Sequence, residues 1–474
     1  MLDKEISAVL AYAENMLMMD ELDAEQAVRR ICSLLKLDGF IPAELDESEE
    51  IPTTPTKLLE PLLNYAVEQK IVSPENKDVL RAEIMDAVML RPSEINDLFS
   101  DTYAVNKQKA FDFLYDYCVK SGYVDLDKLA KNDRWEAKEL KSRIELIINL
   151  MPASVTDGYP PCALCKENEG YRDRANMRSV LTEIDGEEFF FNYSRHQYFD
   201  RHGVLCTREH KPMKESADML KKLALAADFI GQDGFVGTNG ATEGSGATNT
   251  AHAHFQTGFR TTPMFRAGVK TKLKSKEYPY IELSVLDWYC TVIRFAHSSL
   301  DKIVEFAVKL NDAWKGYSDA RIQNTDGKKN FCNFIVRKIA GKYVFDAVLR
   351  SNGIKKASTS PEYSEIKPSA LSLNDILGYF VLPNKLSGQL NKVQLYLDGT
   401  IPFEPGKLDP EMKSFEKMIA RMMKEQGGTV SKLEAKLNVH DEVDAVCEKI
   451  LAGTAVFDSE SILPFLELMG IEVK

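Results

Sequence analysis

Apolar residues recur at helical spacing through the first 150 residues. The segment after residue 56 shows the pattern well, with apolar side chains at Leu58, Leu59, Leu62, Leu63, Ala66 and Val67. Positions spaced by three and four residues lie on one face of a helix. The acidic, proline- and threonine-rich stretch 46–56 predicts a loop between helices. We therefore expect residues 1–150 to form a helical N-terminal region.

Strand patterns begin after a boundary rich in proline and glycine near residue 152. Apolar runs at 180–184 and 188–193 flank Asp185-Gly186, a pair typical of a two-residue hairpin turn. A helix is expected at about 214–229, followed by a glycine-rich stretch at 234–246 and a strand that carries histidines. We assign residues 151–265 to one half of a sheet-containing core.

A similar order of elements follows from residue 266 to 405. Strands are predicted within 281–295, a helix at 300–314 and a hairpin at 333–350 that turns at Ala340-Gly341. The alternation of Val393, Leu395 and Leu397 predicts one more strand. Residues 406–474 return to helical composition. The predicted fold class is α+β, with antiparallel sheets in two related halves between a helical N-terminal region and a helical C-terminal tail.

The charge balance excludes several classes of protein. The chain has 60 Lys plus Arg against 72 Asp plus Glu, a net charge of −12, without the basic stripe of a nucleic-acid binder. No apolar stretch approaches the roughly 20 residues that a membrane span needs. The acidic start, Met1 to Glu5, is unlike a secretory leader. We expect a cytoplasmic protein that binds neither nucleic acid nor membranes.

The segment 251–256, Ala-His-Ala-His-Phe-Gln, is the first candidate for chemistry. In a strand, His252, His254 and Gln256 share one face. A neutral imidazole can attack phosphorus and later leave, and Gln256 can donate to a phosphoryl oxygen. The preceding glycines, with Thr248 and Asn249, offer backbone N–H groups to phosphate. A structural metal pair or a satisfied polar strand is the alternative interpretation.

Cys162 and Cys165 form the second candidate site. Two cysteines at this spacing can bind zinc when two further ligands complete a tetrahedron, and His210 and His252 are the candidates. Two unliganded cysteines in a turn are the alternative. A redox pair is disfavoured because Pro160-Pro161 precedes the motif and no βαβ pattern surrounds it.

Single cations and aromatic residues complete the candidates. Stacking on a nucleotide base is one role for Tyr193 and Phe191, although strand aromatics are usually core. Phosphate contact is one role for five cations, although such a residue is more often a solvated surface charge: Arg178, Arg195, Arg260, Arg350 and Lys367.

Several blocks in order resemble the hexose-1-phosphate uridylyltransferases of the histidine-triad superfamily. The chain looks most similar to the second, bacterial type of galactose-1-phosphate uridylyltransferase. The resembling blocks lie at 162–171, 193–202, 209–213, 235–239, 252–256 and 349–350, and the helical N-terminal region also looks alike. The resemblance is broadest over residues 140–400.

The resemblance implies a role for each site residue. His254 would accept the uridylyl group, Gln256 would stabilise phosphoryl oxygens, and Thr248 and Asn239 would contact phosphate. Cys162, Cys165, His210 and His252 match the family's structural zinc ligands, and no organic cofactor is implied. UDP-glucose would give UMP to His254 in a ping-pong reaction, and galactose 1-phosphate would collect it, a step of galactose metabolism. The resemblance also suggests a homodimer.

Departures from the family pattern fall mostly on the side assigned to the sugar. They include Thr257-Gly258, the block 329–333, the shortened stretch 351–356 and the block 366–369. These differences leave the identity of the hexose open. Two alternatives remain: a nucleotide-sugar phosphorylase or hydrolase on the same fold, and a non-catalytic nucleotide-binding homologue.

Overall fold

The computed structural model describes residues 2–46, 50–137, 144–151, 158–242, 244–247, 249–324, 326–352 and 361–474. The chain folds into two compact units. The first unit comprises residues 1–131, 152–212 and 251–254, and the second comprises 132–151, 213–250 and 255–474. The four-part division made from the sequence stays a prediction. Among the described residues, no helix combines the length and the apolar character needed to cross a membrane.

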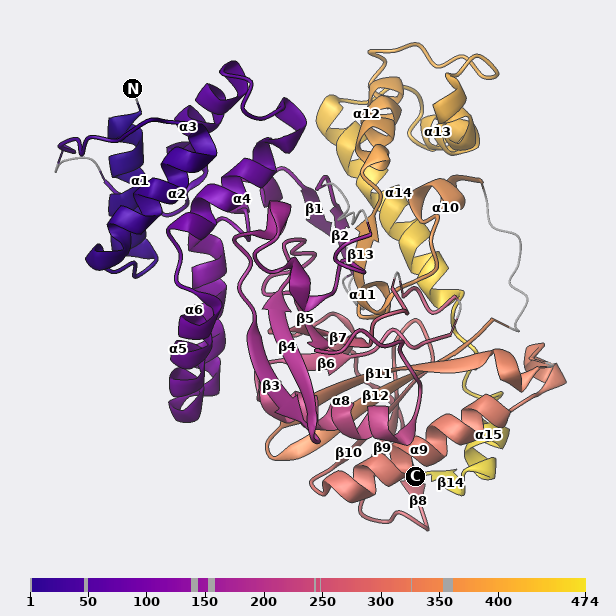
Figure 1. The fold of residues 1–474 in the computed structure, drawn as a ribbon. Helices are drawn as coiled ribbons and strands as arrows, with labels where there is room; N and C mark the ends of the chain where they lie inside the picture. Colours follow the sequence, from indigo (N-terminus) through magenta and orange to yellow (C-terminus); the bar gives the residue numbers. More distant parts are fainter. Residues whose placement is uncertain are drawn as a thin grey trace. The chain divides into compact units, whose positions relative to one another are not determined.

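The first unit begins with the expected helical region (Figure 1). Its α-helices are α1 Asp3–Met16, α2 Ala24–Leu35, α3 Thr56–Glu68, α4 Lys77–Ala87, α5 Pro92–Val105, α6 Lys107–Lys120 and α7 Leu126–Leu129. Each of the longer helices buries one apolar face, as in α3, where Leu59, Leu62, Leu63 and Ala66 are buried.

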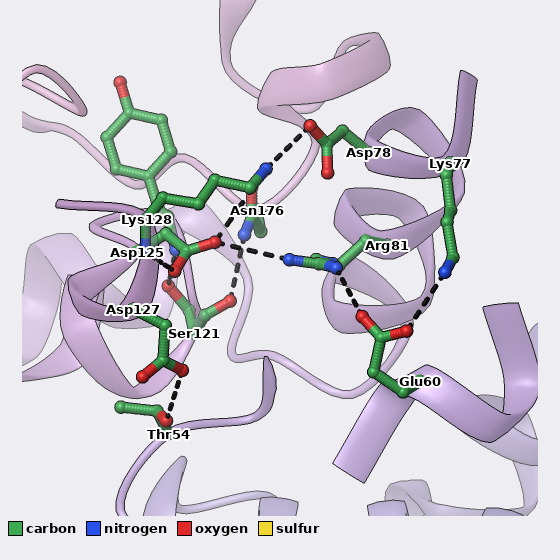
Figure 2. Close-up of polar contacts among 11 residues, drawn as sticks. Thr54, Glu60, Lys77, Asp78, Arg81, Ser121, Asp125, Asp127, Lys128 and Asn176 are labelled. Atoms are coloured by element: carbon green, nitrogen blue, oxygen red, sulfur yellow. Dashed lines mark hydrogen bonds and ion pairs between the residues drawn. The ribbon is translucent and has the colours of Figure 1, made fainter. Parts of the chain in front are cut away.

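Ion pairs join three parts of this helical region (Figure 2). Arg81 on α4 contacts Glu60 on α3 at 3.1 Å and Asp125, just before α7, at 3.3 Å. Lys128 on α7 contacts Asp78 on α4 at 2.6 Å. These contacts tie α3, α4 and α7 together through side chains rather than through the backbone.

The same unit contains the predicted hairpin. β3 Val180–Ile184 and β4 Glu187–Tyr193 pair antiparallel, and β5 Gly203–Thr207 pairs with β4. Asp185 and Gly186 both have positive φ, 52° and 75°, as a type I′ turn requires. Two short 3-10 turns, Lys166–Asn168 and Arg172–Arg174, precede the hairpin.

The second unit contains a run of antiparallel strands. Its strands run in the order β14-β8-β9-β10-β12-β11-β6-β7. Their bounds are β6 Phe235–Gly237, β7 His254–Gly258, β8 Val269–Ser275, β9 Glu282–Leu286, β10 Val292–His297, β11 Asn330–Ile339, β12 Lys342–Ser351 and β14 Ile471–Val473. Helices α8 Ala217–Ile230 and α9 Leu300–Gly316 pack on strands of this sheet and on each other. The predicted hairpin turn at Ala340-Gly341 is confirmed, with φ of 47° and 78°.

The element order repeats, as the sequence predicted. Three strands, a helix and two strands occur as β3-β4-β5-α8-β6-β7 and again as β8-β9-β10-α9-β11-β12. Within the second unit, β6 pairs antiparallel with β11, the strand at the matching place of the other repeat. The α+β fold with two related halves is therefore confirmed.

Two sequence predictions were wrong. Residues 393–397 belong to helix α12, Lys385–Leu397, whose buried Leu386, Leu390, Val393 and Leu397 follow helical spacing. Inside the region expected to be helical, β1 Asp133–Glu136 and β2 Glu145–Ile148 form a small sheet with β13 Tyr379–Leu382. β2 pairs parallel with β13, a partner more than 200 residues away, which local patterns cannot reveal.

The C-terminal region is helical as expected, apart from β14. Its helices are α13 Glu416–Glu425, α14 Lys432–Ala452 and α15 Leu463–Leu468, and α12 packs against α13 and α14. Two short helices, α10 Pro361–Ile366 and α11 Leu373–Ile376, lead into β13.

Candidate active site and metal centre

Two cysteines and two histidines of the first unit converge on one point. The potential ligand atoms of Cys162, Cys165, His210 and His252 all lie within 4.8 Å of one another. Cys162 Sγ is 3.5 Å from Cys165 Sγ and 3.4 Å from His252 Nδ1, and Cys165 Sγ is 3.1 Å from His210 Nδ1. These are the four residues that the sequence singled out as a ligand set.

The spacing of the Cys162, Cys165 and His252 atoms fits a tetrahedral ion. Zinc bonds of about 2.3 Å to sulfur and about 2.0 Å to nitrogen place ligand atoms roughly 3.3–3.8 Å apart at the edges of a tetrahedron. The distances between Cys162, Cys165 and His252 fall in or close to this range. A set of two thiols and two imidazoles matches a closed structural zinc site, which keeps no open position for substrate.

Side-chain contacts from Asn168 and Arg174 hold the loop that carries Cys162 and Cys165 in shape. The Asn168 side chain donates to the carbonyls of Cys162 and Cys165 at 2.9 and 2.8 Å. The Arg174 guanidinium donates to the carbonyl of Ala163. The two cysteines therefore sit on a loop whose carbonyls are fixed from outside, which presents both sulfur atoms to the same point.

A backbone carbonyl fixes the orientation of His252. Its Nε2 lies 2.8 Å from the carbonyl oxygen of Thr207, the last residue of β5. A carbonyl only accepts hydrogen bonds, so Nε2 carries the proton and Nδ1 presents its lone pair to the cysteines. An outer partner of this kind usually orients metal-bound histidines.

His254 has the opposite tautomer. Its Nδ1 lies 2.8 Å from the carbonyl oxygen of His252, so Nδ1 carries the proton and the lone pair is on Nε2. The side chain is 6% exposed. Burial lowers the pKa of His254 below its usual value and outweighs the hydrogen bond to the His252 carbonyl. The ring is therefore neutral at pH 7, as a nucleophile must be.

The strand that follows begins later than the sequence argument assumed. β7 starts at His254, and His252 precedes it, so the expected common face of three residues holds only for His254 and Gln256. Gln256 is half-buried and opposite Gly237 of β6. His252 instead lies in the segment 251–254, which precedes most of the strand. In this segment the backbone N–H of Ala253 donates to the carbonyl of Lys211 at 2.7 Å.

In the second unit, Arg350 organises the glycine-rich loop. Its guanidinium donates to the carbonyls of Ser245 and Leu371 at 3.0 and 2.9 Å and to the side chain of Asn333 at 3.0 Å. A Cβ at Gly246 would lie 2.2 Å from the Leu371 carbonyl oxygen, so this approach requires glycine. Arg350 thus holds the glycine-rich loop in a closely packed conformation.

Asn239 joins the same cluster. Its carbonyl accepts from the Asn333 side chain at 2.6 Å, and its own side-chain oxygen accepts from the Leu373 backbone at 2.6 Å. Asn249 is half-buried, and Thr248 lies outside the described residues. The predicted residues Asn239 and Arg350 are thus brought together through Asn333.

Three other residues that were candidates for substrate contact are buried and make contacts within the protein. Arg178, 2% exposed, donates to the carbonyls of Leu90, Ala175 and Met177 and pairs with Asp86. The Tyr193 hydroxyl donates to the carbonyl of Phe111 at 3.0 Å, and Phe191 is fully buried. Their roles in binding substrate stay predictions, and binding would require these contacts to be exchanged.

The remaining predicted cations also have acidic partners. Lys367 pairs with the buried Asp375 at 2.9 Å, and Arg260 pairs with Glu145 at 2.8 Å. Arg195 pairs with Asp173. None of these three is brought into the Arg350 cluster by a contact among the described residues.

Sequence reasoning missed two groups that shape the site. Asn333 joins Arg350 to Asn239. It lies in the block 329–333, whose departure from the family pattern could have drawn attention to it. The carbonyl of Thr207 sets the tautomer of His252. Nothing in the sequence indicates this role, because every residue has a carbonyl.

The comparisons with known proteins agree with this geometry. A protein named galactose-1-phosphate uridylyltransferase from Streptococcus thermophilus is 30% identical, over 80% of this chain and 82% of its own length. Proteins of the same name from Bifidobacterium longum subsp. longum and Caldanaerobacter subterraneus subsp. tengcongensis are 27% and 28% identical, covering 99% and 95% of this chain and 98% and 94% of their own. No family model matches the chain.

Solved structures are more distant. Yeast Ap4A phosphorylase Apa2 is 12% identical with a TM-score of 0.32, over 56% of this chain and 83% of its own, a likeness that carries no conclusion.

The uridylyltransferase relatives define the class of the protein, which is a nucleotidyltransferase enzyme. Within that class the chain belongs to the galactose-1-phosphate uridylyltransferase family.

Proposed function

We propose that this protein transfers UMP from UDP-glucose to galactose 1-phosphate through a covalent bond to His254. In the first step, Nε2 of His254 attacks the α-phosphorus of UDP-glucose. The bond from that phosphorus to the bridging oxygen breaks, and glucose 1-phosphate leaves. In the second step, a phosphate oxygen of galactose 1-phosphate attacks the same phosphorus and releases the imidazole.

The tautomer of His254 is the observation that carries this proposal. The 2.8 Å contact between Nδ1 and the His252 carbonyl leaves the Nε2 lone pair available for attack. The same carbonyl stabilises the positive charge that the ring acquires when Nε2 forms a bond to phosphorus.

Other residues would bind the substrate and stabilise the transferred group. Gln256, two residues along β7, would donate to a phosphoryl oxygen whose charge changes during transfer. Asn239, Thr248 and Asn249, with the loop that Arg350 holds, would contact the diphosphate. Family membership and the close packing of the loop support these assignments.

Zinc would be held by Cys162, Cys165, His210 and His252, and it would serve as a structural cross-link. The donor set and the spacing of its atoms support zinc over a hard cation. His252 would then connect two functions: its ring binds the metal, and its carbonyl orients His254.

An exchange experiment tests the proposal and separates it from the alternatives. The protein is incubated with UDP-glucose and labelled glucose 1-phosphate, without a second sugar phosphate. Ping-pong transfer predicts that label enters UDP-glucose, that His254→Ala abolishes the exchange, and that His297→Ala retains it. Free UMP without exchange would indicate a hydrolase, and UDP formed only with inorganic phosphate would indicate a phosphorylase. Either result would contradict the proposal.

A further inference from the structure

The second unit contains a cavity separate from the glycine-rich loop. Its volume is about 220 Å³, larger than the roughly 150 Å³ that holds benzene in an engineered apolar cavity. β9 and the residues after it form one side, and the segment 455–466 near the C-terminus forms the other. Nothing in the proposed transfer reaction uses it.

The lining of the cavity is aromatic and aliphatic inside and polar at the rim. Trp288, Phe457 and Ile462 are among the apolar residues that line it. Trp288 is held by a 3.0 Å hydrogen bond from Nε1 to the carbonyl of Ile376, so its ring is already in place. A flat ligand can stack on such a preformed surface without much loss of side-chain entropy.

The rim carries a cation that suits an anionic group. Lys270 is exposed and lines the cavity together with the hydroxyls of Thr271 and Ser459. Asp458, also on the rim, already accepts from the backbone N–H groups of Glu460 and Ser461. The charge of Asp458 is therefore stabilised mainly by its own turn, with a smaller contribution from the Lys270 charge, and the rim presents Lys270 and two hydroxyls to a ligand.

The wall of the cavity connects to Arg350 by direct contacts. The Phe457 ring packs edge-on against Trp314, with centroids 5.4 Å apart. Trp314 Nε1 donates to the backbone carbonyl of Arg350 at 2.9 Å. The Arg350 side chain in turn fixes the carbonyls of Ser245 and Leu371. Phe457 is therefore linked through Trp314 to the residue that holds the glycine-rich loop.

We propose that this cavity is a second ligand site, for a small planar aromatic anion, whose occupancy stiffens the glycine-rich loop through Phe457, Trp314 and Arg350. The proposal goes beyond uridylyl transfer and does not depend on it, because binding is measured without substrate.

Binding is tested with 2-naphthoate as the probe, by titration followed by NMR of the ligand. Saturable binding in the millimolar range or tighter is expected for the unmodified protein. Val285→Phe fills the cavity and should abolish binding, whereas Val269→Phe, on the neighbouring β8 but outside the lining, should not. Absence of saturable binding, or equal binding by Val285→Phe when folded, would overturn the site.

A second pair of variants avoids any change to the core. The unmodified protein should prefer 2-naphthoate to the neutral 2-naphthamide by about threefold, the size expected for one exposed ion pair. Lys270→Gln should remove this preference, and Lys272→Gln, an exposed lysine outside the lining, should keep it. A preference that survives Lys270→Gln would refute the assignment of the anion to this rim.

Hydrogen exchange tests the connection to the loop. Saturating 2-naphthoate should slow exchange of the amides at 244–247 severalfold, and Phe457→Leu should weaken this effect while binding persists. Saturated binding with unchanged exchange at 244–247 would overturn the coupling.

Discussion

Two backbone carbonyls give His252 and His254 opposite tautomers. Thr207 accepts from Nε2 of His252, and His252 accepts from Nδ1 of His254. The first ring therefore presents Nδ1 to the cysteines, and the second carries its lone pair on Nε2. Residue types in the sequence predicted two separate roles, but the tautomers depend on carbonyls, which residue type does not reveal.

The metal assignment leads to a prediction at the scale of single thiols. Cys165→Ser removes one of four ligands and should lower bound zinc from about one ion per chain to nearly none, because structural sites need all four ligands. Elemental analysis of protein purified without chelator measures the content. Cys32→Ser changes a thiol outside the cluster and should leave it unchanged. Full zinc in Cys165→Ser would contradict the ligand set.

At the scale of elements, local periodicity predicted most helices and hairpins and failed where two periods overlap. Val393, Leu395 and Leu397 alternate like a strand, yet Leu386, Leu390, Val393 and Leu397 also follow a helix, and the longer pattern prevailed. The pairing of β2 with β13 escaped prediction because it joins distant segments.

Arg81 is predicted to be a major link between helices of the first unit. Its side chain is 12% exposed and its partner Asp125 is 7% exposed, so Arg81→Met leaves a buried carboxylate whose remaining cation, Lys128, lies 3.9 Å away. We expect a loss of about 2 kcal/mol in the free energy of unfolding, less than for a fully buried pair because Glu60 is partly solvated.

Urea unfolding measures this loss, with Arg29→Met as the control. Arg29 pairs with Glu25 at the surface, 79% and 86% exposed, and its replacement should change stability by less than about 0.5 kcal/mol. Equal effects of the two substitutions would contradict a structural role for the Arg81 network.

Asp78 in the same network (Figure 2) should make the free energy of unfolding depend on pH in the acidic range. Burial would raise the pKa of Asp78, but the Lys128 hydrogen bond and the charges of Lys128 and Arg81 outweigh it, so the pKa lies below its usual 3.8. A carboxylate with a lowered folded-state pKa stabilises the fold above the unfolded pKa and loses that effect as pH falls through the folded value.

The difference in unfolding free energy between unmodified protein and Asp78→Asn should therefore be constant near neutrality. It should shrink as pH falls below about 3.8, the pKa that Asp78 has when unfolded. Urea unfolding over a pH series measures this difference, and Asp97→Asn on α5 controls for the substitution itself. A difference that grows toward acid would show that Asp78 is not held ionised by Lys128.

At the scale of the whole molecule, the sequence was enough to predict the repeat of elements, the set of Cys162, Cys165, His210 and His252 that clusters in the structure, and family membership. It was less informative about single cations. Arg178 and Lys367 are buried against protein carboxylates and carbonyls, and their predicted contact with phosphate stays a prediction. Arg350 is also buried, but its acceptors are carbonyls of the glycine-rich loop, so it affects the proposed site by shaping the loop.

The central claim is that His254 carries the uridylyl group, and the most direct measurement detects that group. The protein is mixed with UDP-glucose alone, digested and analysed by mass spectrometry, and released glucose 1-phosphate is quantified. A uridylylated peptide modified at His254, matched by an equal amount of glucose 1-phosphate and absent from His254→Ala, is the predicted result. An adduct that persists in His254→Ala, or transfer activity without any adduct, would contradict it.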